Sequence, residues 1–131
     1  DITAMKIPFA ATVLISDRNT VARKQPELRK FMRAYAEAVH YFLSNREGAA
    51  KVVAKYTKVE DRDILNYSID TDGKAVQKTL EVDPKGIELV LGLIGKSVPQ
   101  AASAKAEDFY DSRFTNELKD SGFLKRLWGE S

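Results

Sequence analysis

The pattern that most constrains this chain is a stripe of apolar residues at helical spacing in the segment 25–43. Gln25-Pro26-Glu27 is typical of a helix start, because proline is tolerated in the first turn and an acid there complements the helix dipole. Apolar side chains then recur every three or four residues on one face: Leu28, Phe31, Met32, Tyr35, Val39 and Phe42. We therefore expect a long amphipathic helix that packs this stripe against another element.

A short apolar run, from Ile7 to Ile15, precedes this helix and ends at the polar Ser16-Asp17-Arg18-Asn19. Its β-branched and aromatic residues show no strong alternation, which predicts a strand buried on both faces, as in a parallel sheet. Pro8 is tolerable at the start of such a strand. A strand that leads into an amphipathic helix is half of an α/β unit. The sequence thus predicts an α/β fold that is mainly helical, with one or two strands.

The middle of the chain shows two more helical patterns. Ser44-Asn45 separates the long helix from a second one, with a stripe of Ala49, Val52, Val53 and Tyr56. A third, shorter helix is expected from Glu60 to Tyr67. Asp70-Thr71-Asp72-Gly73 is turn-like in composition. The segment 74–82 could be extended or loosely helical.

The last third of the chain carries clear capping signals. Asp83-Pro84 predicts a helix start, followed by the stripe Ile87, Val90, Leu91 and Ile94 and an end at Gly95. A loop is expected over 97–104, then a helical turn at 107–110. Asp111-Ser112 is expected to cap a helix to about Ser121. A left-handed Gly122 would end that helix and bring Phe123 against Leu118 in a Schellman motif.

Composition excludes several classes of protein. The chain has 131 residues, 44% hydrophobic and 31% charged, which is typical of a folded chain. Its 21 basic and 19 acidic side chains are interspersed, which argues against nucleic acid as the main partner. It has no cysteine, so disulfides and Cys-based zinc sites are excluded. No apolar run reaches the roughly 18 to 20 residues that span a bilayer.

Candidate catalytic and metal-binding residues are few. His40 is the single histidine, and we interpret it as a partly exposed helix residue because no second His or Cys completes a metal site. The acids of the segments 60–63 and 107–111 could bind a hard cation, but helix capping explains them better. No nucleophile elbow or glycine-rich phosphate loop occurs. The sequence predicts no enzyme, no cofactor and no metal.

One segment is a candidate ligand contact. Pro8, Phe9, Ala10 and Thr12 place a bulky aromatic side chain among small ones at the lip of the predicted strand. Such a lip can line a pocket for a small molecule. The alternative is that Phe9 is a core residue.

Several segments, taken in order, resemble a known family. They are the Ile7-Pro8-Phe9 strand, Ser16-Asp17-Arg18, Gln25-Pro26-Glu27-Leu28, the helix 31–38, the segment 44–50, Ala106 to Asp111, and Ser121-Gly122-Phe123. The pattern resembles the C-terminal half of the solute-binding proteins of nitrate-, sulfonate- and taurine-type ABC transporters. The resemblance covers nearly the whole chain and consists mostly of packing and capping motifs. The family usually has Asn-Pro-Glu-Glu-Ala where this chain has Asn45-Arg46-Glu47-Gly48-Ala49.

The resemblance implies a type II periplasmic-binding fold, in which two α/β lobes close on a small organic or anionic solute. It implies docking on a membrane permease, a periplasmic or extracytoplasmic location with a lipoprotein anchor as one possibility, and no catalysis. Residues 1–131 would then be a single C-terminal fragment: a return strand followed by helices of the first lobe. Pro8, Phe9, Ala10 and Thr12 would lie near the cleft.

Two alternatives stay open. The chain could be a ligand-sensing or regulatory domain of the same fold, or a relative of the thiamine-pyrimidine-synthesis enzymes. The latter need a cofactor-bearing lysine and a histidine in an N-terminal part that this sequence does not contain. A fragment of this kind should expose apolar surface along Val13 to Ile15 and along the Phe31 stripe. We expect it to self-associate when expressed alone.

Overall fold

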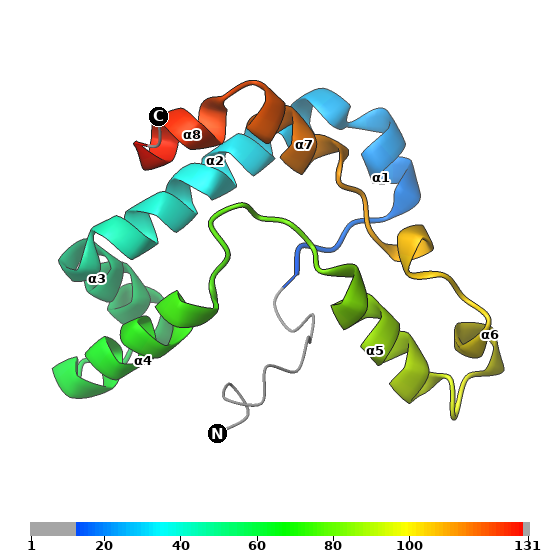
Figure 1. The fold of residues 1–131 in the computed structure, drawn as a ribbon. Coiled ribbons are helices and arrows are strands. Elements are labelled where there is room, and N and C mark those ends of the chain that lie inside the picture. Colours follow the sequence, from blue (N-terminus) through cyan, green and yellow to red (C-terminus); the bar gives the residue numbers. More distant parts are fainter. Residues whose placement is uncertain (1–12, 130–131) are drawn as a thin grey trace.

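A computed structural model describes residues 13–129, and this part of the chain is built of helices joined by loops (Figure 1). In chain order the elements are α1 (Arg18–Arg23), α2 (Gln25–Ser44), α3 (Arg46–Thr57), α4 (Arg62–Ala75), α5 (Pro84–Ile94), α6 (Pro99–Ala102), the 3-10 helix η2 (Ala106–Phe109), α7 (Arg113–Asp120) and α8 (Phe123–Trp128). None of the described helices has the combination of length and apolar composition that a membrane span requires.

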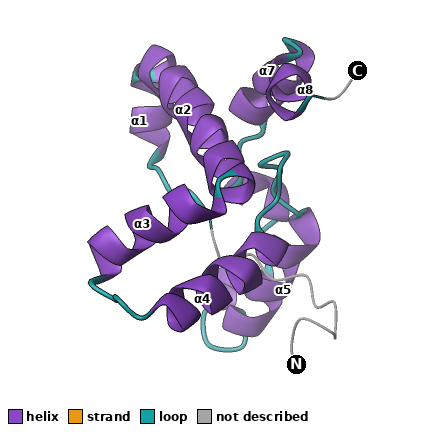
Figure 2. Cartoon of the chain, turned by 90° about the vertical axis from the view of Figure 1, so that its left-hand side faces the viewer, coloured by secondary structure: helices purple, strands orange, loops and turns teal. Residues whose placement is uncertain are grey.

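The expected α/β fold is wrong for the described residues, where Figure 2 shows helices and loops but no strand. Val13, Leu14 and Ile15, the described end of the predicted strand, lie in a loop and are exposed. A strand needs a neighbouring strand to pair its backbone groups, and the described residues offer none. The rest of the predicted strand, residues 7–12, lies outside the described part.

The polar segment after this run starts a helix instead of only ending a strand. The Asp17 carboxylate accepts a hydrogen bond from the Thr20 backbone N–H at 2.9 Å and another from the Thr20 hydroxyl at 2.7 Å. These bonds cap α1 and lower the pKa of Asp17, because they stabilise its charged form. The cap is an Asp three residues before a Thr, a signal present in the sequence.

The predicted long helix is confirmed as α2, and it is the central element of the structure (Figure 1). Helices α1, α3, α7 and α8 all pack on it, and α4 packs on α3. Ala36 and Val39 of α2 are buried, whereas Phe31 remains 51% exposed. The predicted exposure of apolar side chains is therefore confirmed both at Phe31 and along Val13 to Ile15.

The core lies where α2 meets α7 and α8. Ala36, Phe123 and Leu124 form its buried centre, with Leu80, Leu118, Leu127 and Trp128 packed around it. Gly122 adopts the predicted left-handed conformation, with φ of 68°, and its N–H donates to the Lys119 carbonyl at 2.9 Å. This sharp turn lets α7 and α8 pack on the same helix.

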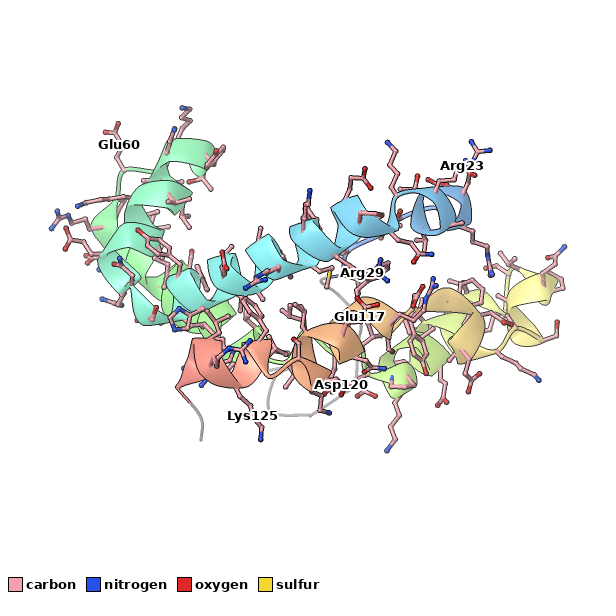
Figure 3. The ribbon with its side chains drawn as sticks, turned by 90° about the horizontal axis from the view of Figure 1, so that it is seen from above. Arg23, Arg29, Glu60, Glu117, Asp120 and Lys125 are labelled. Carbon is pink, nitrogen blue, oxygen red and sulfur yellow. The ribbon has the colours of Figure 1, made fainter. Side chains whose placement is uncertain are left out.

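A charged bridge joins α2 to α7. The Arg29 guanidinium donates to both carboxylate oxygens of Glu117, at 2.6 and 2.8 Å, and Figure 3 shows the two side chains pointing toward one another. The Arg29 guanidinium also lies 5.7 Å from the ring centre of the buried Phe114. The pair thus closes over the edge of the apolar contact between the two helices.

The predicted ends of several helices are confirmed. The Asn45 side chain accepts from the Gly48 N–H at the start of α3, and the Asp83 carboxylate accepts from the Lys85 N–H at the start of α5. The helix expected after Asp111-Ser112 is α7, but it is the Asp111 carboxylate that accepts from the Arg113 N–H.

Two expectations about irregular segments are wrong. Helix α4 continues through the segment 70–73, which we expected to be a turn. Tertiary contacts explain this: Asp70 pairs with Arg46 at 2.7 Å, and Ile69 is buried, so packing overrides the local turn preference. The expected loop over 97–104 contains the short helix α6, which begins at Pro99.

Helix α5 belongs to a separate group of packed helices, in which α6 and η2 both contact it. This group lies on the opposite side of the molecule from α3 and α4 (Figure 1). One hydrogen bond connects it to α1, from the Arg18 guanidinium to the Asp108 carbonyl at 2.9 Å. Among the described residues, the α5 group therefore packs mainly within itself.

Candidate functional site

The predicted ligand contacts Pro8, Phe9, Ala10 and Thr12 all lie outside the described residues. The first described residue, Val13, directly follows them and lies against α5, where it lines an open apolar hollow. The structure therefore gives no geometry for the predicted contacts, but it describes the surface next to them.

This hollow, which we call the α5 groove, has a volume of about 270 Å³. Its lining residues are all apolar: Val13, Ile87, Val90, Leu91, Ile94 and Phe109. Leu91 is buried at its base, whereas Phe109 is 58% exposed at its side. A groove with this lining can bury apolar groups but offers no charged side chain to an anion.

The sequence around α5 explains the shape of the groove. The Asp83 cap and Pro84 fix the start of the helix, so Ile87, Val90 and Ile94 fall on neighbouring turns. At the other end, a Cβ atom on Gly95 would lie 2.9 Å from the Leu91 carbonyl oxygen and 3.1 Å from Ala102 Cα. Glycine at position 95 thus permits the close approach of α6 that holds this end of α5 in place.

A second hollow, the α4 cavity, lies between the end of α2, the start of α3 and α4. It has a volume of about 230 Å³ and is lined by Phe42, Leu43, Arg46, Ile69, Asp70, Gly73 and Lys74. Both hollows are smaller than the roughly 300 to 1,000 Å³ of typical small-molecule pockets. The α4 cavity differs from the α5 groove because charged side chains line part of it.

The charges of the α4 cavity largely neutralise one another. Arg46 donates to both carboxylate oxygens of Asp70, at 2.7 and 3.1 Å. This hydrogen bonding lowers the pKa of Asp70 and raises the pKa of Arg46. Because the Arg46 guanidinium already binds Asp70, an incoming anion would have to compete with this carboxylate for it. The pair is better explained as a link that positions α4 on α3.

His40 is a partly exposed residue of α2 that packs against an aromatic ring, in agreement with its interpretation from the sequence. Its ring meets the Trp128 ring edge-on, with 4.9 Å between the centroids. The ammonium of Lys78 lies 4.6 Å from the centre of the same indole. These contacts tie α2, α8 and the loop after α4 together. His40 therefore belongs to a packing cluster between helices.

Two of the acids that we considered as cation ligands, Asp61 and Asp111, act in a helix start and in an ion pair. Asp61 accepts from the backbone N–H groups of Asp63 and Ile64 and caps α4. Asp111 is bound by the guanidinium of Arg113 at 2.6 Å, which lowers the pKa of its carboxyl. Within residues 13–129, no group of three or more His, Asp or Glu side chains is arranged to hold a metal ion.

The α5 groove is the feature that sequence reasoning missed. The stripe of α5 was predicted, but a stripe does not reveal whether a partner covers it. A signal was present: Leu89 and Leu93 add apolar residues outside the stripe. A helix that is apolar on more than one side usually packs against more than one neighbour.

Comparison with known proteins adds no assignment. No family model matches this chain. No curated protein matches it significantly, and neither does any solved structure.

Proposed function

We propose that this chain is the solute-binding component of an ABC importer, acting outside the cytoplasm. It binds a small organic or anionic solute and presents it to a membrane permease. The proposal rests on the resemblance of the sequence to the solute-binding proteins of nitrate-, sulfonate- and taurine-type transporters.

The observation that carries the proposal is that the segments behind the resemblance are discrete structural units. Gln25-Pro26-Glu27 begins α2, Asn45 caps α3, and Gly122 makes the left-handed turn before α8. The segment 106–109 forms the 3-10 helix η2. These capping signals are the part of the resemblance that lies within the described residues, and they carry no information on the solute.

The proposed solute contacts are Pro8, Phe9, Ala10 and Thr12. The polypeptide continues from them into Val13, whose side chain lines the α5 groove. The two hollows of the described part are small and shallow, and neither is needed by the proposal. It therefore depends on residues 8–12 and is tested best by substituting them.

The test is a thermal-shift screen of the 131-residue chain against taurine and other sulfonates, nitrate, pyrimidines and aromatic acids. A solute at 100 times its dissociation constant stabilises the folded state by about 2.7 kcal/mol. For a chain of this size that raises the melting temperature by roughly 10 °C.

Two variants sharpen the result. Phe9→Ala is expected to remove the stabilisation by the solute, while Phe31→Ala, which changes an exposed side chain on α2, should retain it. Failure of every solute class to stabilise the chain would contradict the proposal. Equal loss with both variants would contradict the assignment of the contacts.

A further inference from the structure

We propose that the segment 7–12 of this same chain occupies the α5 groove and packs apolar side chains along α5. The segment lies outside the described residues. The inference does not rest on the proposed function, because it concerns the chain without solute and its test contains none. It follows from the position of Val13, from the reach and sequence of the segment, and from the charges around the groove.

Val13 already contacts the α5 groove at the point where the segment joins the described chain. Its side chain lines the hollow together with residues of α5. Val13 is 43% exposed, whereas Ile15, two residues further along, is 89% exposed. The chain is thus partly covered where it meets the groove and loses this cover as it leaves. Because Thr12 is bonded to Val13, with Cα atoms about 3.8 Å apart, the segment 7–12 starts beside the groove.

The segment is long enough to follow the groove from end to end. Ile87 and Ile94 line its two ends, and seven residues of helix correspond to about 10 Å along the axis. Four residues of chain can span up to roughly 13 Å. The stretch from Val13 back to Phe9 can therefore cover the whole apolar face of α5 that the groove exposes.

The sequence of the segment suits an apolar hollow. In an extended stretch every second side chain shares a face, so the side chains on the face of Val13 are Ala11, Phe9 and Ile7, all apolar. The segment 7–12 contains no charged residue, and the residues that line the groove are apolar as well. The segment can thus fill the groove without burying an unpaired charge.

Charged side chains stand around the groove instead of lining it. Lys85 and Glu88 of α5 and Glu107 and Asp108 of η2 are exposed there. A second copy that docked with the same face would bring its own set of these charges against them. An uncharged segment avoids this conflict and leaves all four side chains in water.

The connection to Val13 also favours this segment over a separate molecule. A segment on a short tether meets its site at an effective concentration in the millimolar range, whatever the concentration of the chain. Exposed aromatic side chains on α3 and α4, Tyr56 at 78% and Tyr67 at 74%, are a competing apolar surface. However, these helices lie on the opposite side of the molecule from α5 (Figure 1), whereas Val13 lies against α5.

The test is a double-mutant cycle between Phe9 and Ile94, measured by urea unfolding of residues 1–131 without solute. Phe9→Ala should raise the equilibrium constant of unfolding by roughly tenfold or more, because it removes a ring from the filled groove. In the Ile94→Ala background this effect should shrink by about fivefold, because the two side chains share a contact. The matched control background is Ile64→Ala on α4, where the side chain is 55% exposed; there Phe9→Ala should keep its full effect.

A second measurement needs no variant. In the original chain, nuclear Overhauser contacts should join the Phe9 ring to methyl groups of Val90 or Ile94, and they should persist when the sample is diluted tenfold. Absence of these contacts, or additive effects in the cycle, overturns the proposal. Coupling of Phe9 to Ile64 places the segment on α4 and also overturns it. Contacts that fade on dilution, in a sample that sedimentation equilibrium shows to dissociate, belong to a second copy and overturn it as well.

Discussion

The α2 region and the α5 group are both built from amphipathic helices, but they differ in how their apolar faces are covered. On α2, Ala36 is 2% exposed, and Phe123 and Leu124 of α8 close over it. In the α5 group, Ile94 of α5 and Phe109 of η2 remain exposed beside an open groove. The same kind of sequence signal is therefore covered around Ala36 of α2 and left open around Ile94 of α5, although Phe31 of α2 is also exposed and Leu91 of α5 is buried.

The difference has a physical origin in what each helix meets. Around α2 the partners supply matched side chains: Arg33 lies 4.4 Å from the ring centre of Phe123, and Arg29 binds Glu117. Around α5 the described partners are the short α6 and η2, which are too small to cover a helix that is apolar on several sides. Apolar periodicity shows which face of a helix is apolar. Whether that face is buried depends on the size and side chains of the neighbouring helices.

The largest expected effect comes from two phenylalanines, one in each region. Phe123→Ala should lower the free energy of unfolding by about 3 kcal/mol, because it removes a buried ring from the core and leaves a cavity. Phe109→Ala should change it by no more than about 0.5 kcal/mol in dilute solution, because that ring is mostly exposed. Urea unfolding followed by circular dichroism measures both. Similar losses for the two variants would break the contrast between the regions.

A second pair compares two glycines. Gly122→Ala should destabilise the chain by about 1 to 2 kcal/mol, because an alanine at a φ of 68° is strained. Gly92→Ala should stabilise it by about 0.5 to 1 kcal/mol, because a Cβ on this glycine of α5 meets no atom within 4 Å. Thermal unfolding of both variants gives the signs, and a stabilised Gly122→Ala would show that the turn between α7 and α8 is not needed.

The smallest expected effect is the pH dependence of the bridge between α2 and α7. Hydrogen bonds from Arg29 lower the pKa of Glu117 below its ordinary value of 4.5. The folded state thus gains stability above that value, and it loses this contribution as the pH falls through the lowered pKa. Glu117→Gln should flatten this part of the profile of unfolding free energy against pH. Arg29→Gln should flatten it in the same way. A profile that neither variant changes would show that the Arg29–Glu117 pair does not stabilise the contact between α2 and α7.

Helix starts and ends could be predicted because they depend on neighbours in the sequence. Asn45 and Asp83 cap their helices through backbone groups two or three residues away, and Gly122 adopts the left-handed conformation that glycine tolerates best. The extension of α4 through Asp70 could not be predicted, because the stabilising partner, Arg46, belongs to another helix. The predicted strand was wrong at its described end, Val13 to Ile15, for a similar reason, since a strand exists only with a partner to pair it.

One candidate site was predicted from the sequence, and the other was found only in the structure. The predicted solute contacts Pro8, Phe9, Ala10 and Thr12 stay predictions, because they lie outside the described residues. The α5 groove could not be predicted from the sequence, since its walls come from Val13, α5 and η2, which are far apart in the chain. Local spacing and capping signals were enough to show which faces are apolar and where most helices begin. Which of those faces are covered followed only from the fold, because burial depends on contacts between distant segments.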